Sequence, residues 1–364
     1  MYCGGQGVYI CYLAGALQEL GHEVHVVSGP PYPSPPDGVK LHKVLGLNLY
    51  ETSNLSSLSN PLRAFTPLNL YEIAAVHIGF FPDIFTFSMR AYFKLRELMS
   101  SERFDVIHDN QTLGYGLLLM KSLGVPIVAT IHHPITVDLA ASLAQSDTFR
   151  RGIRWTMFYS FLTMQGIVSR RMARVITVSH SSAEDTARAF KLRQDRVRVV
   201  YNGIDTGIFR RLDHVDKEPN SLVIVGKVED KTKGIPYLLE AVKLLKGDVD
   251  LKVYVVGKQE ASEGYGTNLA RQLGISDRVT FTGYVSTDEL VRLYSSAEIG
   301  VTSSVYEGFG LPAAEAMACG TPVIATRAGA LPEIVGDDAA GILVPPGDPP
   351  ALAAAIKRLL ADKP

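Results

Sequence analysis

Two glutamates flank a glycine-rich turn in the second half of the chain, where residues 307–315 read EGFGLPAAE. Gly310 suits the N-cap of a helix, and Pro312 suits its first turn because proline lacks an N–H that would be unpaired there. The start of such a helix presents unpaired N–H groups and about half a positive charge to an anion. We therefore predict an anion site, with Glu307 on the loop over it and Glu315 in the first turns of the helix. The alternative is that both carboxylates are structural.

A loop rich in lysine lies earlier in the same half. Residues 226–234 read GKVEDKTKG and include Lys227 and Lys233. A loop that leaves the carboxyl end of a strand lies where open α/β sheets bind ligands. Ammonium groups at that position can neutralise a diphosphate. A solvated charged loop is the alternative interpretation of this segment taken alone.

Glycines also open the chain, as Gly4-Gly5-Gln6-Gly7 before an apolar-periodic helix. Glycine lets the backbone approach a ligand closely, and the N–H groups at a helix start favour an anion. The segment lacks the Gly-x-Gly-x-x-Gly pattern and a preceding strand, so we expect no NAD site. A flexible N-terminal turn is the alternative.

The elements that must position these residues alternate between strand and helix, which predicts an α/β protein with parallel sheets. The alternation restarts near residue 221, so we expect two Rossmann-like domains, at residues 1–205 and 206–364. Expected strands are short apolar runs, at residues 24–27, 39–45, 104–108, 126–131, 174–178, 222–225, 251–256, 279–281, 299–302 and 322–325. Expected helices include residues 8–20, 235–245, 287–295 and 311–319.

Composition fits two globular domains. The chain has 364 residues, 46% of them apolar and 20% charged, as in ordinary globular proteins. Three scattered cysteines argue against a disulfide framework and for a reducing cytoplasm. The net charge of −1 gives no field that would attract nucleic acid, so we expect no nucleic-acid partner.

Membrane association is expected to be peripheral at most. The opening residues lack the charged and apolar regions of a secretory leader, and the most apolar stretch, residues 66–87, is interrupted by Glu72, Pro82 and Asp83. Residues 150–198 contain eleven basic and three acidic residues. This patch is either a solvated helical face or, around Arg150–Arg174, a contact for an anionic acceptor or the inner face of a membrane.

Taken as a set, the motifs resemble family 4 of the retaining GT-B glycosyltransferases over nearly the whole chain. The resemblance rests on EGFGLPAAE with the following AMACGTPVIA, on the lysine loop and on the opening glycines. It also includes the strand ends DVIH and ATIH, which carry His108 and His132, the junction YNGID and the closing turn GILVPPGD. The resemblance implies two Rossmann-like domains facing across a cleft, an acceptor-side domain followed by a nucleotide-sugar domain. Relative to that pattern, we expect the first strand and the final crossover helix to be missing.

The resemblance also implies a role for each motif residue. Lys227 and Lys233 would hold the donor diphosphate, and Glu315 the ribose hydroxyls. Glu307 would hold the donor sugar, with His132 near the reacting carbon. The backbone that would assist Glu307 comprises Gly308, Phe309, Gly310 and Leu311, and the residues that would close over the donor are Gly4 and Gly5.

The implied activity is transfer of a hexosyl unit from a UDP- or GDP-sugar to an acceptor hydroxyl, by front-face attack and without a metal or other cofactor. Lysines and a helix N-terminus would stabilise the leaving diphosphate, an effect on the order of 3 kcal/mol per donor. The Asp-x-Asp at Asp248–Asp250 is interpreted as a turn and not as a metal site. Such enzymes serve polysaccharide or cell-envelope synthesis, and the acceptor would be a glycan, a lipid or a small molecule.

Three alternatives stay open. Glu307 and Glu315 could be the acid and nucleophile of a hydrolase, although that leaves the lysine loop unexplained. A GT-B sugar-nucleotide epimerase and a non-catalytic relative that only binds the donor are the other two. For the acceptor, the sequence suggests an amphiphilic or anionic molecule, because Arg150, Arg151 and Arg154 lie beside Trp155 and Phe158.

Overall fold

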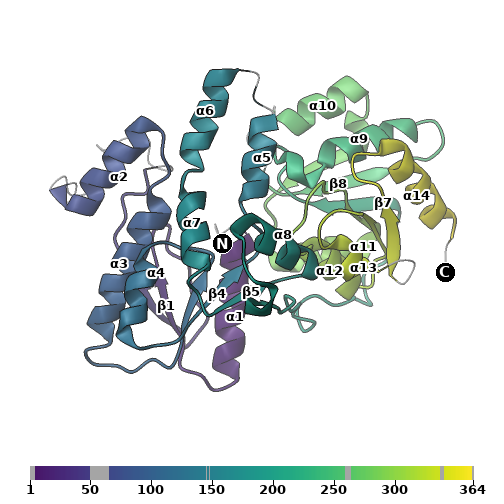
Figure 1. The fold of residues 1–364 in the computed structure, drawn as a ribbon. Coiled ribbons are helices and arrows are strands. Elements are labelled where there is room, and N and C mark those ends of the chain that lie inside the picture. Colours follow the sequence, from purple (N-terminus) through teal and green to yellow (C-terminus); the bar gives the residue numbers. More distant parts are fainter. Residues whose placement is uncertain are drawn as a thin grey trace. The chain divides into compact units, whose positions relative to one another are not determined.

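The computed structural model describes residues 5–49, 65–144, 146, 148–258, 264–336 and 340–362. The chain forms two compact units (Figure 1). Unit 1 comprises residues 1–178 and 183–200, and unit 2 comprises residues 179–182 and 201–364. The expected boundary lies after residue 205, whereas residues 201–205 and the short segment 179–182 belong to unit 2.

Unit 2 is a doubly wound α/β sheet. Its six described strands are parallel in the order β12-β11-β10-β7-β8-β9. The elements of unit 2 are β7 (Glu218–Val225), η5 (Lys231–Lys233), α9 (Ile235–Leu244), β8 (Lys252–Val256), α10 (Tyr265–Leu273), η6 (Ser276–Arg278), β9 (Val279–Gly283), α11 (Thr287–Ser296), β10 (Ala297–Thr302), α12 (Leu311–Ala318), β11 (Val323–Thr326), α13 (Leu331–Val335), β12 (Gly341–Val344) and α14 (Pro349–Ala361).

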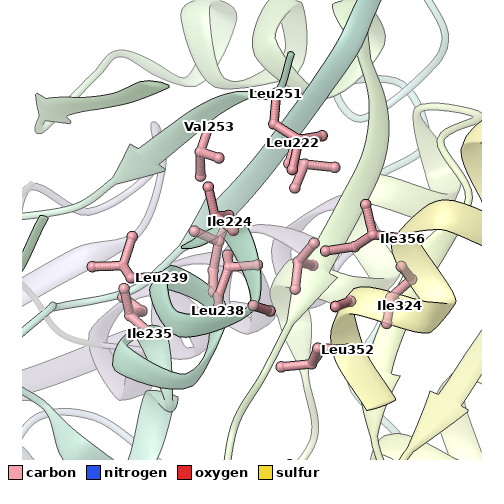
Figure 2. Close-up of a cluster of buried hydrophobic side chains, with 14 of the residues drawn as sticks. Leu222, Ile224, Ile235, Leu238, Leu239, Leu251, Val253, Ile324, Leu352 and Ile356 are labelled. Atoms are coloured by element: carbon pink, nitrogen blue, oxygen red, sulfur yellow. The ribbon is translucent and has the colours of Figure 1, made fainter. Parts of the chain in front are cut away.

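Alternating side chains give this sheet two buried faces. Leu222 and Ile224 of β7 point to the face covered by α9, α10 and α14, where they join a core with Leu238 and Ile356 (Figure 2). Val223 points to the other face, which is covered by α11, α12 and α13. Successive strand residues point to opposite sides, so a run of apolar residues in one strand supports both cores. This is the pattern expected of a parallel sheet with helices on both faces.

Unit 1 contains two parallel sheets among its described residues. One pairs β1 with β2, and the other has the order β3-β4-β5-β6. The elements are α1 (Gly5–Glu19), β1 (His25–Ser28), β2 (Lys40–Lys43), α2 (Pro67–Ile78), α3 (Asp83–Leu98), β3 (Ile107–Asn110), α4 (Gly116–Met120), η3 (Lys121–Leu123), β4 (Ile127–Ile131), α5 (Thr136–Ala144), α6 (Phe149–Phe158), α7 (Phe161–Ser169), β5 (Arg174–Thr177), α8 (His180–Phe190, whose first residues belong to unit 2), η4 (Gln194–Arg196) and β6 (Val197–Val199).

The apolar stretch at residues 66–87 does not form one long helix. Thr66 caps α2 by accepting a hydrogen bond from the backbone N–H of Asn69, and α2 ends at Gly79, whose φ of 103° is left-handed. A new helix, α3, then begins at Asp83 after Pro82. No helix within the described parts of the chain is long and apolar enough to cross a membrane.

Most expected strands form within a few residues of their predicted positions. The prediction at 104–108 was shifted: β3 spans Ile107–Asn110, because the ladder with β4 pairs Ile107 with Ile127 and extends to Asn110 with Thr130. Asp109 and Asn110 therefore belong to the strand itself. The strands β6 and β12 and the helices α2, α3, α10, α13 and α14 were not predicted.

Candidate functional site

The lysine loop and the glutamate loop leave neighbouring strands of unit 2. The lysine loop follows β7 and the glutamate loop follows β10, and these two strands pair in parallel. From β7 the chain proceeds outward through β8 and β9 and then returns to the other side of β7 as β10. The two loops therefore lie at the point where the strand order reverses, which is where open α/β sheets bind ligands.

An ion pair connects the two loops. Lys233 Nζ lies 2.9 Å from Glu307 Oε2, and the side chains are only 28% and 14% exposed. Burial opposes the charge of Lys233, but the Glu307 carboxylate, through its charge and its hydrogen bond, raises the pKa of Lys233 above its usual value. Lys233 is thus held as a cation at the switch point.

Backbone contacts hold the same two loops together. The Val305 N–H donates to the Thr232 carbonyl (2.8 Å), and Ser303 Oγ donates to the Lys233 carbonyl (3.2 Å). Gly234 follows Lys233 with a φ of +62°, and a Cβ there would lie 1.9 Å from the Ser303 carbonyl oxygen. Only glycine fits this conformation so close to another backbone, so Gly234 sets the distance between the loops.

The loop after β11 supports Glu307 from the other side. The Ala330 N–H donates to the Glu307 carbonyl (2.9 Å). Gly329 has a φ of +53°, and a Cβ there would lie 2.0 Å from the same oxygen. Ser304 Oγ donates to Glu307 Oε2 (3.2 Å). The side chain and the backbone of Glu307 are therefore both fixed.

The helix predicted after this loop begins at Leu311, as α12, with Gly310 as its N-cap. Gly310 has a φ of +100°, and Pro312 lies in the first turn, as the sequence predicted. Phe309 is 7% exposed and lies beside the ring of Tyr201, with a centroid distance of 6.3 Å. The Gly308 carbonyl accepts hydrogen bonds from the hydroxyls of Ser179 (2.8 Å) and Ser182 (2.9 Å).

Glu315 extends from α12 toward a buried tyrosine. The hydroxyl of Tyr294, which is 1% exposed, donates to Glu315 Oε2 over 3.1 Å. Burial raises the pKa of Glu315 to about 7, although the hydrogen bond from Tyr294 acts in the opposite direction. Glu315 therefore changes its protonation state near neutral pH.

Glu333 is a polar residue of this region that the sequence analysis missed. Its carboxylate accepts the backbone N–H groups of His180 (2.8 Å) and Ser181 (2.7 Å) and the hydroxyl of Tyr201 (3.1 Å). A carboxylate at the first N–H groups of a helix is favoured by the helix dipole. The run SHSS at residues 179–182 signals a helix start, but nothing in the sequence connects it with Glu333.

The other polar residues predicted in unit 2 are Lys227 and the two aspartates of the Asp-x-Asp. Lys227 is exposed on the lysine loop, two residues after β7. Asp248 pairs with Lys357, and Asp250 lies 3.7 Å from Arg278. Both aspartates precede β8, at the amino end of the strand, whereas the lysine loop leaves a carboxyl end.

His132 belongs to unit 1, at the end of β4. Its Nε2 lies 2.8 Å from Asn110 Oδ1, and its backbone N–H donates to Gln111 Oε1 over 2.8 Å. The ring stacks edge-on against Tyr9 at a centroid distance of 4.6 Å. Burial, together with the charges of His133 and His108, lowers the pKa of His132 to about 4, so the imidazole is neutral at neutral pH.

Of the two glycines predicted to approach the donor at the start of the chain, the structure describes only Gly5. Gly5 is the first residue of α1. Gly4 lies outside the described residues, so the prediction for it has no structural counterpart.

The basic patch divides into two parts. Arg150, Arg151 and Arg154 are exposed on α6, near Phe149, which is 85% exposed. Trp155 instead turns toward Phe158 in an aromatic cluster. Several arginines that follow α6 donate to carbonyl groups of unit 1, namely Arg170, Arg171, Arg174 and Arg196.

One group with metal-ligand geometry occurs among the described residues, and it lies in unit 1. It comprises Glu23, His25 and Glu102, whose ligand atoms lie within 4.8 Å of one another. Lys40 pairs with both glutamates and already neutralises part of their charge. In unit 2, the Glu307 carboxylate is paired with Lys233.

Two family models match the chain in succession. The model described as "Glycosyltransferase Family 4" matches residues 3–207. The model described as "Glycosyl transferases group 1" matches residues 219–362.

Relatives of known name match nearly the full chain. An MMP alpha-(1->4)-mannosyltransferase of Mycolicibacterium hassiacum is 41% identical over 99% of this chain and 86% of its own length. A D-inositol 3-phosphate glycosyltransferase of Mycolicibacterium gilvum is 29% identical, covering 99% of this chain and 78% of that protein. The solved structure of sucrose-phosphate synthase from Thermosynechococcus elongatus is similar with a TM-score of 0.73 and 26% identity, over 99% of this chain and 85% of that one.

The pKa of Glu315 predicts a pH dependence of stability. Its folded-state pKa of about 7 exceeds the ordinary value of 4.5, so the native state holds a proton that the unfolded state releases. The free energy of unfolding should therefore fall as pH rises from about 4.5 to 7, by about 3 kcal/mol for this group. We expect Glu315→Gln to remove that part of the fall, measured by urea unfolding between pH 4.5 and 8.

Glu240→Gln, which removes an exposed carboxylate from α9, controls for the loss of one negative charge. A Glu315→Gln protein with the same pH slope as the wild type would contradict the assignment of a buried, proton-binding carboxylate at this position.

Proposed function

This chain belongs to glycosyltransferase family 4 and is a glycosyltransferase of the GT-B fold, and we propose that it moves a hexosyl unit from a UDP- or GDP-sugar to an acceptor hydroxyl with retention of configuration. A mannosyl unit is favoured by the name of the 41% identical relative, an alpha-(1->4)-mannosyltransferase. Unit 1 would bind the acceptor and unit 2 the nucleotide sugar.

The observation that carries the donor assignment is the Lys233–Glu307 pair between two loops at the switch point of unit 2. A diphosphate needs a fixed cation, and the donor sugar needs a fixed hydrogen-bond acceptor. The pair provides both groups side by side. Backbone contacts on each side prevent them from moving apart.

In the proposed reaction, the bond between the anomeric carbon and the diphosphate oxygen breaks, and the acceptor oxygen forms a bond to the same carbon. Negative charge develops on the leaving diphosphate, where Lys233, Lys227 and the N–H groups at the start of α12 would stabilise it. Groups that are already oriented need no reorganisation during the reaction. Because Glu307 keeps Lys233 charged and in place, Lys233 is the main cation of this proposal.

The remaining donor contacts follow the family resemblance. Glu315 would accept hydrogen bonds from the ribose hydroxyls, and Tyr294 already orients its carboxylate. Glu307 would bind the donor sugar together with the backbone of residues 308–311, which the Ser179 and Ser182 hydroxyls hold at Gly308. Gly4 and Gly5 would approach the phosphates.

In unit 1, His132 would contact the donor sugar near its reacting carbon. An imidazole with a pKa of about 4 offers a neutral hydrogen-bonding group and not a positive charge. The acceptor hydroxyl would then lose its proton to the departing diphosphate on the same face of the sugar, which accounts for retention without a covalent intermediate.

We also propose that the reaction needs no metal ion. The cationic groups just described would carry out the charge neutralisation that a divalent ion performs in other transferases. The Glu307 carboxylate is engaged by Lys233 and is less available as a metal ligand.

Incubation with UDP- and GDP-sugars should release nucleotide diphosphate in the presence of an acceptor and of a chelator. NMR of the product should show the anomeric configuration of the donor. Loss of turnover with a chelator would overturn metal independence, and an inverted product would overturn retention. Isomerised donor without nucleotide release would indicate an epimerase, and binding without any turnover a non-catalytic relative.

Variants of the ion pair should separate binding from transfer. Lys233→Ala should weaken nucleotide diphosphate binding about 10- to 100-fold, the range for one charge-assisted hydrogen bond, and should reduce transfer as well. Glu307→Gln should reduce transfer much more than nucleotide binding. Calorimetry and initial rates measure the two effects, with Lys243→Ala, at an exposed lysine of α9, as the control.

Equal losses of binding and transfer in Glu307→Gln would refute the sugar-holding role of Glu307. Unchanged nucleotide affinity in Lys233→Ala would refute the diphosphate role of Lys233.

We further propose that α6 associates with an anionic membrane surface. A groove of about 530 Å³ runs along α5 and α6 and is lined by Leu143, Phe149 and Ile153, which are 39%, 85% and 44% exposed. Exposed apolar side chains beside arginines match an interface of acyl chains and anionic headgroups.

Sedimentation with phosphatidylglycerol vesicles should detect this association, and it should weaken with salt. Arg150→Gln and Arg154→Gln should each reduce the vesicle affinity about fivefold, since one basic residue contributes roughly 1 kcal/mol. Arg188→Gln, on α8 with a side chain 78% exposed, is the control. Absence of binding at low salt, or equal binding by all variants, would contradict the proposal.

A further inference from the structure

A second cavity lies at the carboxyl ends of three strands of unit 1. It measures about 380 Å³, and residues that follow β1, β2 and β3 line it, together with residues of α2 and α3. This volume is at the lower end of the range for small-molecule pockets. None of its lining residues is shared with the groove on α5 and α6.

The charged groups of this cavity are two carboxylates and one guanidinium. Glu72 of α2 is 2% exposed and forms an ion pair with Arg90 of α3. Arg90 also donates to Asn69. Its charge is therefore compensated inside the protein, because Glu72 is its partner.

Asp83, the first residue of α3, is the second carboxylate that lines the cavity, and the residue is partly exposed. Its Oδ1 is buried, and among the described residues it has no hydrogen-bond partner. A buried carboxylate oxygen without a donor is costly. A ligand hydroxyl would reach Asp83 through the exposed part of its side chain, because Oδ1 itself is covered by the protein. Burial, and then the charge of Glu72, raise the pKa of Asp83 to about 6, so it is mainly ionised at neutral pH.

The cavity also connects to His132. Asn110 and Gln111 line it, and both contact His132, through Nε2 in one case and the backbone N–H in the other. Gln111 is 5% exposed, and its side chain amide also donates to the His133 carbonyl over 2.7 Å. Hydrogen bonds thus connect the wall of the cavity to His132, the residue proposed to lie near the reacting carbon of the donor sugar.

We infer that this cavity binds the acceptor, that the acceptor is a neutral sugar ring with free hydroxyls, and that Asp83 determines this specificity. The inference rests on the proposed glycosyl transfer. Sugar hydroxyls donate to a carboxylate, whereas a phosphate would meet the charges of Asp83 and Glu72 with only a compensated Arg90 to oppose them. The sequence-based hypothesis of an anionic acceptor relied on arginines of α6, which do not line this cavity.

The substrate preference follows directly. Methyl α-mannoside or methyl α-glucoside should be glycosylated with a higher kcat/KM than mannose 6-phosphate. Asp83→Asn should raise the KM for the neutral glycoside about tenfold, with the KM for the donor and the hydrolysis of donor without acceptor unchanged. Glu97→Gln, which removes an exposed carboxylate near the other end of α3, is the matched control.

Binding measured without turnover separates this inference from the proposed function. Saturation-transfer NMR of methyl α-mannoside should show binding to the wild type and to Glu97→Gln and a clear loss in Asp83→Asn, while circular dichroism confirms that each variant is folded. A preference for mannose 6-phosphate, or equal glycoside binding by wild type and Asp83→Asn, would overturn the inference. Glycoside binding through Asp83 with no transfer from any nucleotide sugar would instead refute the proposed function.

Discussion

The arrangement of the loops in unit 2 depends on the close approach of two backbones at Gly234. A side chain at this position would collide with the Ser303 carbonyl. Because glycine has none, the loops after β7 and β10 can lie in direct contact. That contact brings a lysine and a glutamate, 74 positions apart in the chain, within hydrogen-bonding distance. The parallel pairing of β7 with β10 places both loops at one edge of the sheet, and glycine allows them to meet.

The same region controls charge by burial as well as by pairing. Glu307 and Lys233 compensate each other, whereas Glu315 is largely withdrawn from water beside a neutral tyrosine and binds a proton more tightly. Two glutamates eight positions apart therefore have different electrostatic surroundings. Two carboxylates in one motif do not by themselves indicate the acid and the nucleophile of a hydrolase. Here Glu307 pairs with Lys233 and Glu315 with Tyr294, so these contacts do not support the hydrolase interpretation.

Local signals were sufficient for much of the fold. Apolar runs located most strands of unit 2, and Gly310 with Pro312 located the start of α12. The contacts of Glu333 and the cavity around Asp83 required tertiary packing. In the sequence, Glu72 and Asp83 only interrupt an apolar stretch, and their common location follows from the packing of α2 with α3. Likewise, the contact of His132 with Asn110 depends on the register of β3 with β4, which a motif search does not supply.

The four residues at positions 179–182 have a consequence for modularity. They lie within the sequence of the first half, yet they provide hydroxyl and N–H partners for the Gly308 carbonyl and the Glu333 carboxylate of unit 2. The two halves are therefore not separable by a single cut in the polypeptide. Recombination between relatives that exchanged only the portion after residue 200 would give Gly308 and Glu333 foreign partners at residues 179–182. This short segment and the rest of unit 2 are therefore expected to be inherited together.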